Sequence, residues 1–134
     1  MSTLYSQTSL TEDQVIHIIR ENVEIQFPKD CAVCGHRFCS FKEYIKGTDQ
    51  LGKPRSYDAD EQIWQPHDPI GIFSFSKCKR CENTLTLDSY KSNVATIQQL
   101  LGWIKEEVMR RSIMVDELLD DLRVKVENQI LNEE

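Results

Sequence analysis

The chain has 134 residues, of which 40% are apolar and 28% charged, which is the composition of a globular protein rather than a disordered one. Its 22 acidic and 16 basic side chains give a net charge of −6, which argues against a general polyanion binder. No apolar run approaches the ~20 residues of a membrane-spanning helix, and the first residues lack the basic start and apolar stretch of a signal peptide. We therefore expect a cytoplasmic protein that makes no membrane contact.

The five cysteines stand at positions 31, 34, 39, 78 and 81. An odd number of cysteines, without a signal peptide, does not suit the disulfide framework of a secreted protein. A reducing compartment, in which the thiols stay free to bind metal, suits the pattern better. The cysteine-bearing segment is also mildly basic and lies between two acidic flanks.

The first predicted element is a short N-terminal helix. Thr11 followed by Gln14 fits a capping box, and Ser9 with Glu12 gives an alternative frame. The isoleucines and the valine that follow form a broad apolar stripe through about Asn22, which indicates one buried helix face.

Four segments in the first two thirds of the chain have strand character. Apolar and polar side chains alternate in residues 23–27 before Pro28, and β-favouring residues are frequent in 36–46 and 69–76. Residues 84–87 alternate again. Six of the nine glycine and proline residues fall within 47–71, so this stretch is predicted to be rich in turns. The middle of the chain is thus predicted to be a small antiparallel β unit with a long loop over residues 47–69.

The last third of the chain is predicted to be helical. From about residue 92 it contains no proline and a single glycine, Gly102. Its apolar residues recur at spacings of three and four, which places them on one helix face. These residues are Ile97, Leu101, Ile104, Val108, Val115, Leu118, Leu122 and Val126. Arg111 interrupts the stripe, so the segment is either one long helix or two helices that meet near 110–113.

This apolar stripe is too long for a small β unit to cover, so it is expected to be buried elsewhere. A homodimer or larger complex would bury it, as would a helical hairpin. We favour the intermolecular arrangement, because Arg111 and Ser112 at the break are neither glycine nor proline. This reasoning divides the chain into residues 1–91, with the N-terminal helix and the β unit, and residues 92–134, an oligomerisation segment.

The strongest motif is a pair of Cys-x-x-Cys sequences, Cys31 with Cys34 and Cys78 with Cys81. This spacing lets one tight turn direct two sulfur atoms at a single ion, and Gly35 permits the positive φ that such a turn often needs. Two such turns supply four thiolates, the closed tetrahedral set of a structural zinc site. We therefore predict one structural Zn²⁺ per chain.

Residues 27–88 resemble a zinc ribbon, in which two cysteine knuckles on β-hairpins hold one ion. The second pair follows one predicted strand directly and precedes another. The resemblance implies that Cys31, Cys34, Cys78 and Cys81 are the four metal ligands. The long interval between the pairs implies an inserted loop.

Other ligand sets and an enzymatic site are less well supported. Cys31 and Cys34 with His36 and Cys39 would form a local site, but this set would leave the second pair without a role. We interpret Cys39 as a small buried apolar residue and His36 as a polar neighbour of the knuckle. No catalytic residue is assigned, because no nucleophile, base and orienting group can be assembled and four thiolates leave no open metal position.

Four basic residues lie near the cysteines: Arg37, Lys77, Lys79 and Arg80. One interpretation is contact with nucleic-acid phosphates. The favoured one is charge compensation, because Zn²⁺ with four thiolates carries a net charge of −2 and nearby cations stabilise it. Four basic residues are too few for tight nonspecific binding to nucleic acid, so only weak binding is expected.

Together these patterns predict an α+β fold, with a small antiparallel zinc-ribbon unit between a short N-terminal helix and a long C-terminal helical segment. The favoured function is that of a non-enzymatic zinc-binding adaptor or regulator that mediates protein–protein assembly. The alternative is a zinc-ribbon regulator of transcription that binds nucleic acid.

Overall fold

The computed structural model describes residues 10–88 and 93–133, and these residues form the predicted mixture of helices and antiparallel sheet. The helices are α1 (Glu12–Glu24), α2 (Phe41–Gly47), α3 (Tyr57–Asp60), α4 (Val94–Arg111) and α5 (Val115–Leu131). The strands are β1 (Lys29–Asp30), β2 (Arg37–Phe38), β3 (Thr48–Ser56), β4 (Ile72–Cys78) and β5 (Thr84–Asp88).

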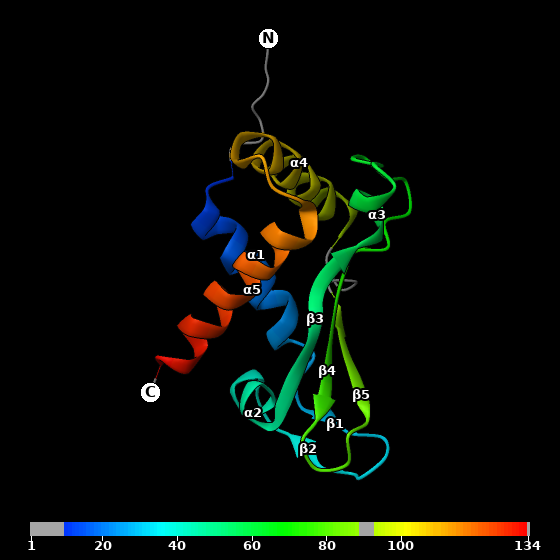
Figure 1. The fold of residues 1–134 in the computed structure, drawn as a ribbon, viewed down its shortest axis with the longest axis vertical. Helices are drawn as coiled ribbons and strands as arrows, with labels where there is room; N and C mark the ends of the chain where they lie inside the picture. Colours follow the sequence, from blue (N-terminus) through cyan, green and yellow to red (C-terminus); the bar gives the residue numbers. More distant parts are fainter. Residues whose placement is uncertain (1–9, 89–92, 134) are drawn as a thin grey trace.

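Two antiparallel sheets organise the described chain. β1 pairs with β2 in a short hairpin, and the longer sheet has the order β3-β4-β5. Figure 1 shows α1 and α5 beside this longer sheet, with α4 near one of its ends and the β1–β2 hairpin near the other. The turn between β4 and β5 lies at the same end as the hairpin (Figure 1), so both Cys-x-x-Cys sequences occupy one end of the molecule.

The N-terminal helix begins as predicted, but it ends later than expected. The Thr11 side chain accepts from the backbone N–H of Gln14 at 3.1 Å, and the Gln14 side chain accepts from the backbone N–H of Thr11 at 2.9 Å. Ser9, of the alternative frame, lies outside the described residues. The predicted strand at 23–27 is wrong: α1 continues through Glu24 and is capped at Ile25. Val23 continues the apolar helix face, so the helical period prevails over the local alternation.

The predicted strand at 36–46 is also largely wrong. Only Arg37–Phe38 is a strand, and the residues after it form α2. Ser40 caps this helix by accepting from the backbone N–H of Glu43 at 3.2 Å. Ser40 followed by Glu43 is itself a capping-box pattern, so the sequence contained the signal for this helix.

The predicted loop at 47–69 begins with the longest strand, β3. It pairs with β4, with Thr48 opposite Cys78 and Ser56 opposite Ile72. The register shifts between Leu51 and Arg55, and this interval contains Gly52, with φ of 67°, and Pro54. An edge strand tolerates both residues at such an irregularity, which explains why they do not prevent strand formation.

The rest of this loop is held in place by Asp58, in α3. Its carboxylate is buried and accepts from the backbone N–H groups of Ile70, at 3.1 Å, and Gly71, at 2.9 Å. These bonds fix the chain where it enters β4. The strands predicted at 69–76 and 84–87 correspond to β4 and β5.

The C-terminal segment forms two helices, so the interruption at Arg111 is a genuine break. α4 ends at Arg111 and is capped by Ser112, which adopts a left-handed conformation with φ of 56°, and α5 begins at Val115. Ser112 takes the backbone conformation for which glycine is the usual residue at a helix end.

The apolar stripe of these helices is buried within the single chain, so it does not need a partner to cover it. Association with a partner stays a prediction. Ile97 and Leu101 pack with Ala59 in a small cluster. The other six stripe residues lie in the main core or pack against it, namely Ile104, Leu118, Leu122, Val126, Val108 and Val115. That core also contains Val15 of α1 and Leu85 of β5, so it draws on both sides of the expected boundary at residue 91. The longer sheet and α1 supply more apolar surface than the sequence suggested, which removes the reason for expecting a dimer through this face.

An ion-pair cluster joins α1, α4 and α5 where the stripe is interrupted. Arg111 contacts Glu12 at 2.7 Å, Glu107 at 2.8 Å and Asp121 at 3.3 Å. Lys125 contacts both Glu12 and Asp121 at 3.0 Å. Arg111 therefore links three helices at a position where one continuous helix would have required an apolar residue.

This cluster predicts a pH-dependent stability. Hydrogen bonds from Lys125 lower the pKa of Glu12 and of Asp121. A lowered folded-state pKa stabilises the fold above the unfolded pKa values of about 4, and this contribution is lost as the pH falls through the folded values. We expect Arg111→Met to lower the free energy of unfolding by about 1 kcal/mol at pH 7, since the pairs are partly exposed. The difference from the unsubstituted protein should shrink toward pH 3 in urea titrations. A difference that is constant with pH would contradict this role.

Candidate metal centre

The first cysteine pair lies in a tight turn between β1 and β2. The backbone N–H of Cys31 donates to the carbonyl of His36 at 2.9 Å, and the backbone N–H of Gly35 donates to the carbonyl of Cys31 at 2.9 Å. Gly35 has φ of 75°, so the positive φ expected there is confirmed. The turn places Cys34 three residues after Cys31 and closes the hairpin.

The second cysteine pair lies in a turn with the same hydrogen bonds, between β4 and β5. The backbone N–H of Cys78 donates to the carbonyl of Asn83 at 2.9 Å, and the backbone N–H of Glu82 donates to the carbonyl of Cys78 at 2.8 Å. Glu82 occupies the position that corresponds to Gly35, and its φ is 66°. The two turns are therefore structural repeats of one knuckle.

The two knuckles bring four sulfur atoms together. The Sγ atoms of Cys31, Cys34, Cys78 and Cys81 all lie within 4.8 Å of one another. Cys31 Sγ is 3.5 Å from Cys81 Sγ, and Cys34 Sγ is 3.9 Å from Cys78 Sγ. Each close pair joins one knuckle to the other. This is the arrangement of a site that can hold one metal ion.

Two of the clustered thiols, Cys31 and Cys81, have pKa values shifted in opposite directions. Backbone N–H groups of Cys34 and Val33 lower the pKa of Cys31 to about 6. The backbone of Asn83 favours the Cys81 thiolate, but burial and the three neighbouring sulfur atoms raise the pKa of Cys81 to about 12. Cys31 and Cys81 thus ionise unequally without a cation, whereas a bound metal requires both as thiolates.

The two residues that only the alternative ligand set contains, His36 and Cys39, lie outside this cluster. His36 Nδ1 is 2.6 Å from Arg80 Nη1, and its ring packs edge-on against Phe38 with centroids 4.7 Å apart. An arginine only donates, so Nδ1 is the acceptor in this bond. The interpretation of Cys39 as a buried residue is wrong: Cys39 is exposed, and its backbone N–H donates to the Glu43 side chain at 3.1 Å.

The four basic residues near the cysteines are brought to the same end of the molecule, but most of them have local partners. Arg37 pairs with Asp30 at 2.8 Å, and Lys79 Nζ donates to the carbonyl of Lys46 at 2.9 Å. Arg80 donates to His36, as described above, and Lys77 lies half-buried on β4. Three of the four basic side chains are therefore engaged with groups of the chain itself.

The positive φ of Gly35 predicts that replacing this glycine with alanine destabilises the protein. We expect Gly35→Ala to lower the free energy of unfolding by about 1 kcal/mol, because an L-residue is strained at positive φ. The added Cβ would have no atom within 4 Å, so strain alone is tested. The matched control is Gly102→Ala in α4, where the Cβ also has open space. This control should stabilise the protein by about 0.5–1 kcal/mol, since alanine favours a helix over glycine. If chemical denaturation shows the same change in the free energy of unfolding for Gly35→Ala and Gly102→Ala, Gly35 does not occupy a strained left-handed position.

Comparisons with protein-family models, curated proteins and solved structures give no match. A search of the described helices finds no segment that is both long enough and apolar enough to cross a membrane. The functional argument therefore rests on the geometry of the chain itself.

Proposed function

We propose that the chain is a non-enzymatic zinc-binding adaptor or regulator, in which one structural Zn²⁺ shapes a surface for protein–protein assembly. The observation that carries this proposal is the convergence of four cysteine sulfur atoms from two repeated knuckles. Zinc with Zn–S bonds of ~2.3 Å places its four sulfur ligands ~3.8 Å apart. Two sulfur pairs that join the knuckles, at 3.5 and 3.9 Å, are near this value.

A structural role for the ion follows from the ligand set. Four thiolates fill the tetrahedral positions of zinc and leave none for a water molecule or a substrate. Such an ion contributes its binding energy to folding instead. Here it would join the β1–β2 hairpin to the β4–β5 turn, two segments that are far apart in sequence.

The metal end of the molecule also presents an apolar side chain to solvent. Val33, between the first two cysteines, is 66% exposed. The knuckle hydrogen bonds and a bound ion would hold it rigidly, so little side-chain or loop entropy would be lost on association. This combination supports assembly with another protein through the knuckle.

The alternative, nucleic-acid binding, has weaker support. Arg37 is already paired with Asp30, and Lys79 and Arg80 donate to groups of the chain itself. If all four basic residues contacted phosphates, the log–log salt slope of binding would be about −3.6 on B-DNA. Local pairing of these residues predicts a smaller slope and weak affinity.

The test is affinity capture from native extract with the zinc-loaded full chain, with and without nuclease. Val33→Asp changes the knuckle, and Met109→Asp is the matched control, because Met109 is 71% exposed on α4. We expect a protein partner that resists nuclease, is lost with Val33→Asp and is retained with Met109→Asp. If nuclease abolishes the capture, and replacing Lys79 and Arg80 with alanine abolishes it too, the chain binds nucleic acid. This result would favour the alternative and contradict the adaptor.

A further inference from the structure

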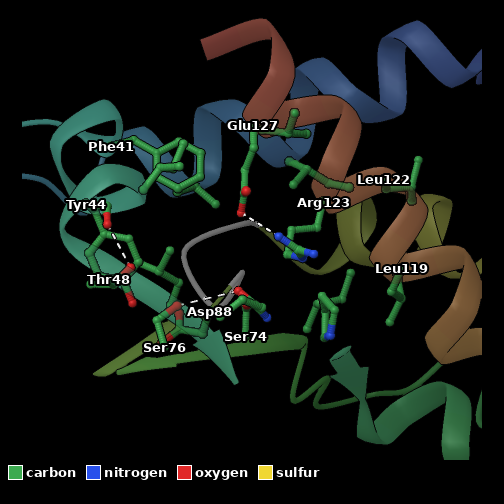
Figure 2. Close-up of a pocket in the computed structure, with 18 residues that line it drawn as sticks. Phe41, Tyr44, Thr48, Ser74, Ser76, Asp88, Leu119, Leu122, Arg123 and Glu127 are labelled. Carbon is green, nitrogen blue, oxygen red and sulfur yellow. Dashed lines mark hydrogen bonds and ion pairs between the residues drawn. The ribbon is translucent and has the colours of Figure 1, made fainter. Parts of the chain in front are cut away.

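A pocket of about 120 Å³ lies between the longer sheet and the helices α1, α2 and α5, and none of the four clustered cysteines lines it. Its walls are mainly apolar, with Val23 from α1, Ile45 from α2 and Leu119 from α5. Figure 2 shows Leu119 and Leu122 toward one end of the pocket and Tyr44, Thr48 and Ser76 toward the other. The pocket is partly open to solvent, so a small molecule can enter it from outside.

The polar end of the pocket contains one unsatisfied donor. The Tyr44 hydroxyl is buried and has no hydrogen-bond partner among the described residues. Its polar neighbours do have partners: Thr48 Oγ1 donates to the Tyr44 carbonyl at 2.7 Å, and Gln50 Oε1 accepts from Ser74 at 3.3 Å. Buried polar groups are nearly always hydrogen-bonded, so the unpartnered hydroxyl points to a missing acceptor.

The Tyr44 ring is fixed, so its hydroxyl has a defined position. It packs edge-on against Phe27, with centroids 5.5 Å apart, and against Phe38, at 5.4 Å. Burial raises the pKa of Tyr44 to about 12, against a smaller lowering by the nearby Ser76 hydroxyl, so the Tyr44 hydroxyl stays protonated at neutral pH. The hydroxyl can therefore donate a hydrogen bond to an acceptor on a bound molecule.

The charges around the pocket disfavour an anionic ligand. Arg123 contacts Asp120 at 2.8 Å and Glu127 at 3.0 Å, so two carboxylates already neutralise it (Figure 2 shows the pair with Glu127). Glu127 itself lines the pocket. A carboxylate or phosphate placed here would face acidic groups without a free cation, whereas a neutral molecule would not.

We propose that this pocket binds a small neutral ring compound of about the size of phenol, with its ring among the apolar walls and its oxygen accepting from Tyr44. An apolar cavity of ~150 Å³ is known to bind benzene, and the pocket is slightly smaller. A single six-membered ring therefore matches the space between the apolar walls. This site is independent of the metal centre.

The experiment is a ¹H–¹⁵N NMR titration of the full zinc-loaded chain with phenol, toluene and benzoate. We expect phenol to shift the signals of residues that line the pocket, and to bind about two- to tenfold more tightly than toluene, which is the effect of one hydrogen bond. Benzoate should not bind over the same concentrations. The Tyr44→Phe variant should bind phenol only as tightly as it binds toluene. The matched control Tyr57→Phe, at a 42% exposed tyrosine in α3, should leave both affinities unchanged.

Three results would overturn the proposal: no binding of phenol up to its solubility limit, benzoate binding as tightly as phenol, or a phenol preference that survives Tyr44→Phe. A pocket-filling variant, Ile45→Phe, should abolish binding of both neutral probes. The three-probe series on the unsubstituted chain is decisive even if a variant fails to fold.

Discussion

Replacing Cys78 with serine should release the metal and unfold the end of the molecule that holds both knuckles. Cys78 is fully buried and ends β4, where it pairs opposite Thr48 of β3. Structural zinc contributes on the order of 10–16 kcal/mol of apparent binding energy in finger peptides, which is comparable to the whole stability of a small domain. Metal analysis and NMR spectra of Cys78→Ser should therefore show a metal-free protein that has lost the dispersed signals of β4 and β5.

The control for this experiment is Cys39→Ser. Cys39 is exposed and lies outside the sulfur cluster, so its replacement should leave the metal content and the spectrum unchanged. If Cys78→Ser retains a full equivalent of zinc, or if Cys39→Ser loses it, the four-cysteine assignment is wrong.

Truncating Leu118 should be the most damaging change outside the metal centre. Its side chain is completely buried in the main core, on α5. We expect Leu118→Ala to lower the free energy of unfolding by about 2–5 kcal/mol, the range for large-to-small core substitutions. Val124→Ala on the same helix is the control, because Val124 is exposed and its truncation should cost no more than about 0.5 kcal/mol.

The same variant distinguishes a core residue from an interface residue. If Leu118 belongs to the core of a single chain, the urea midpoints of the unsubstituted protein and of Leu118→Ala should not depend on protein concentration. Destabilisation that appears only on dilution, with a shift from dimer to monomer in sedimentation equilibrium, would show that the stripe is an interface instead.

The cysteine pairs of the candidate metal centre could be predicted from the sequence because the information for each pair is local. Each Cys-x-x-Cys pair fixes two ligands through one turn, so Cys31 and Cys34 are together whatever the rest of the chain does. Gly35 likewise predicted the positive φ in the turn of the first knuckle. Glu82 in the second knuckle did not predict it, because a non-glycine residue at positive φ has no clear sequence signal. The strand pattern of residues 36–46 did not predict the exposed position of Cys39, because Ser40 directly after it caps α2 instead.

The parts of the fold that were missed depend on contacts between distant residues. β3 contains Gly52 and Pro54, which locally favour a loop, and it exists because β4 pairs with it and α5 packs near it. The break between α4 and α5 needs a left-handed residue, and Ser112 supplies it without the glycine that would have predicted a hairpin. The pocket around Tyr44 draws its walls from several elements, so no periodic pattern in the chain reveals it.

The most direct test of the central claim is metal analysis combined with zinc K-edge X-ray absorption on the purified full chain. The account predicts one Zn²⁺ per chain, bound by four sulfur atoms at ~2.3 Å, with no nitrogen or oxygen in the first coordination sphere. A tetrahedral sulfur site also suits iron, so the absorption edge identifies the metal as well as its ligands. A chain without metal, iron in place of zinc, or a mixed sulfur and nitrogen shell that includes His36 would contradict it.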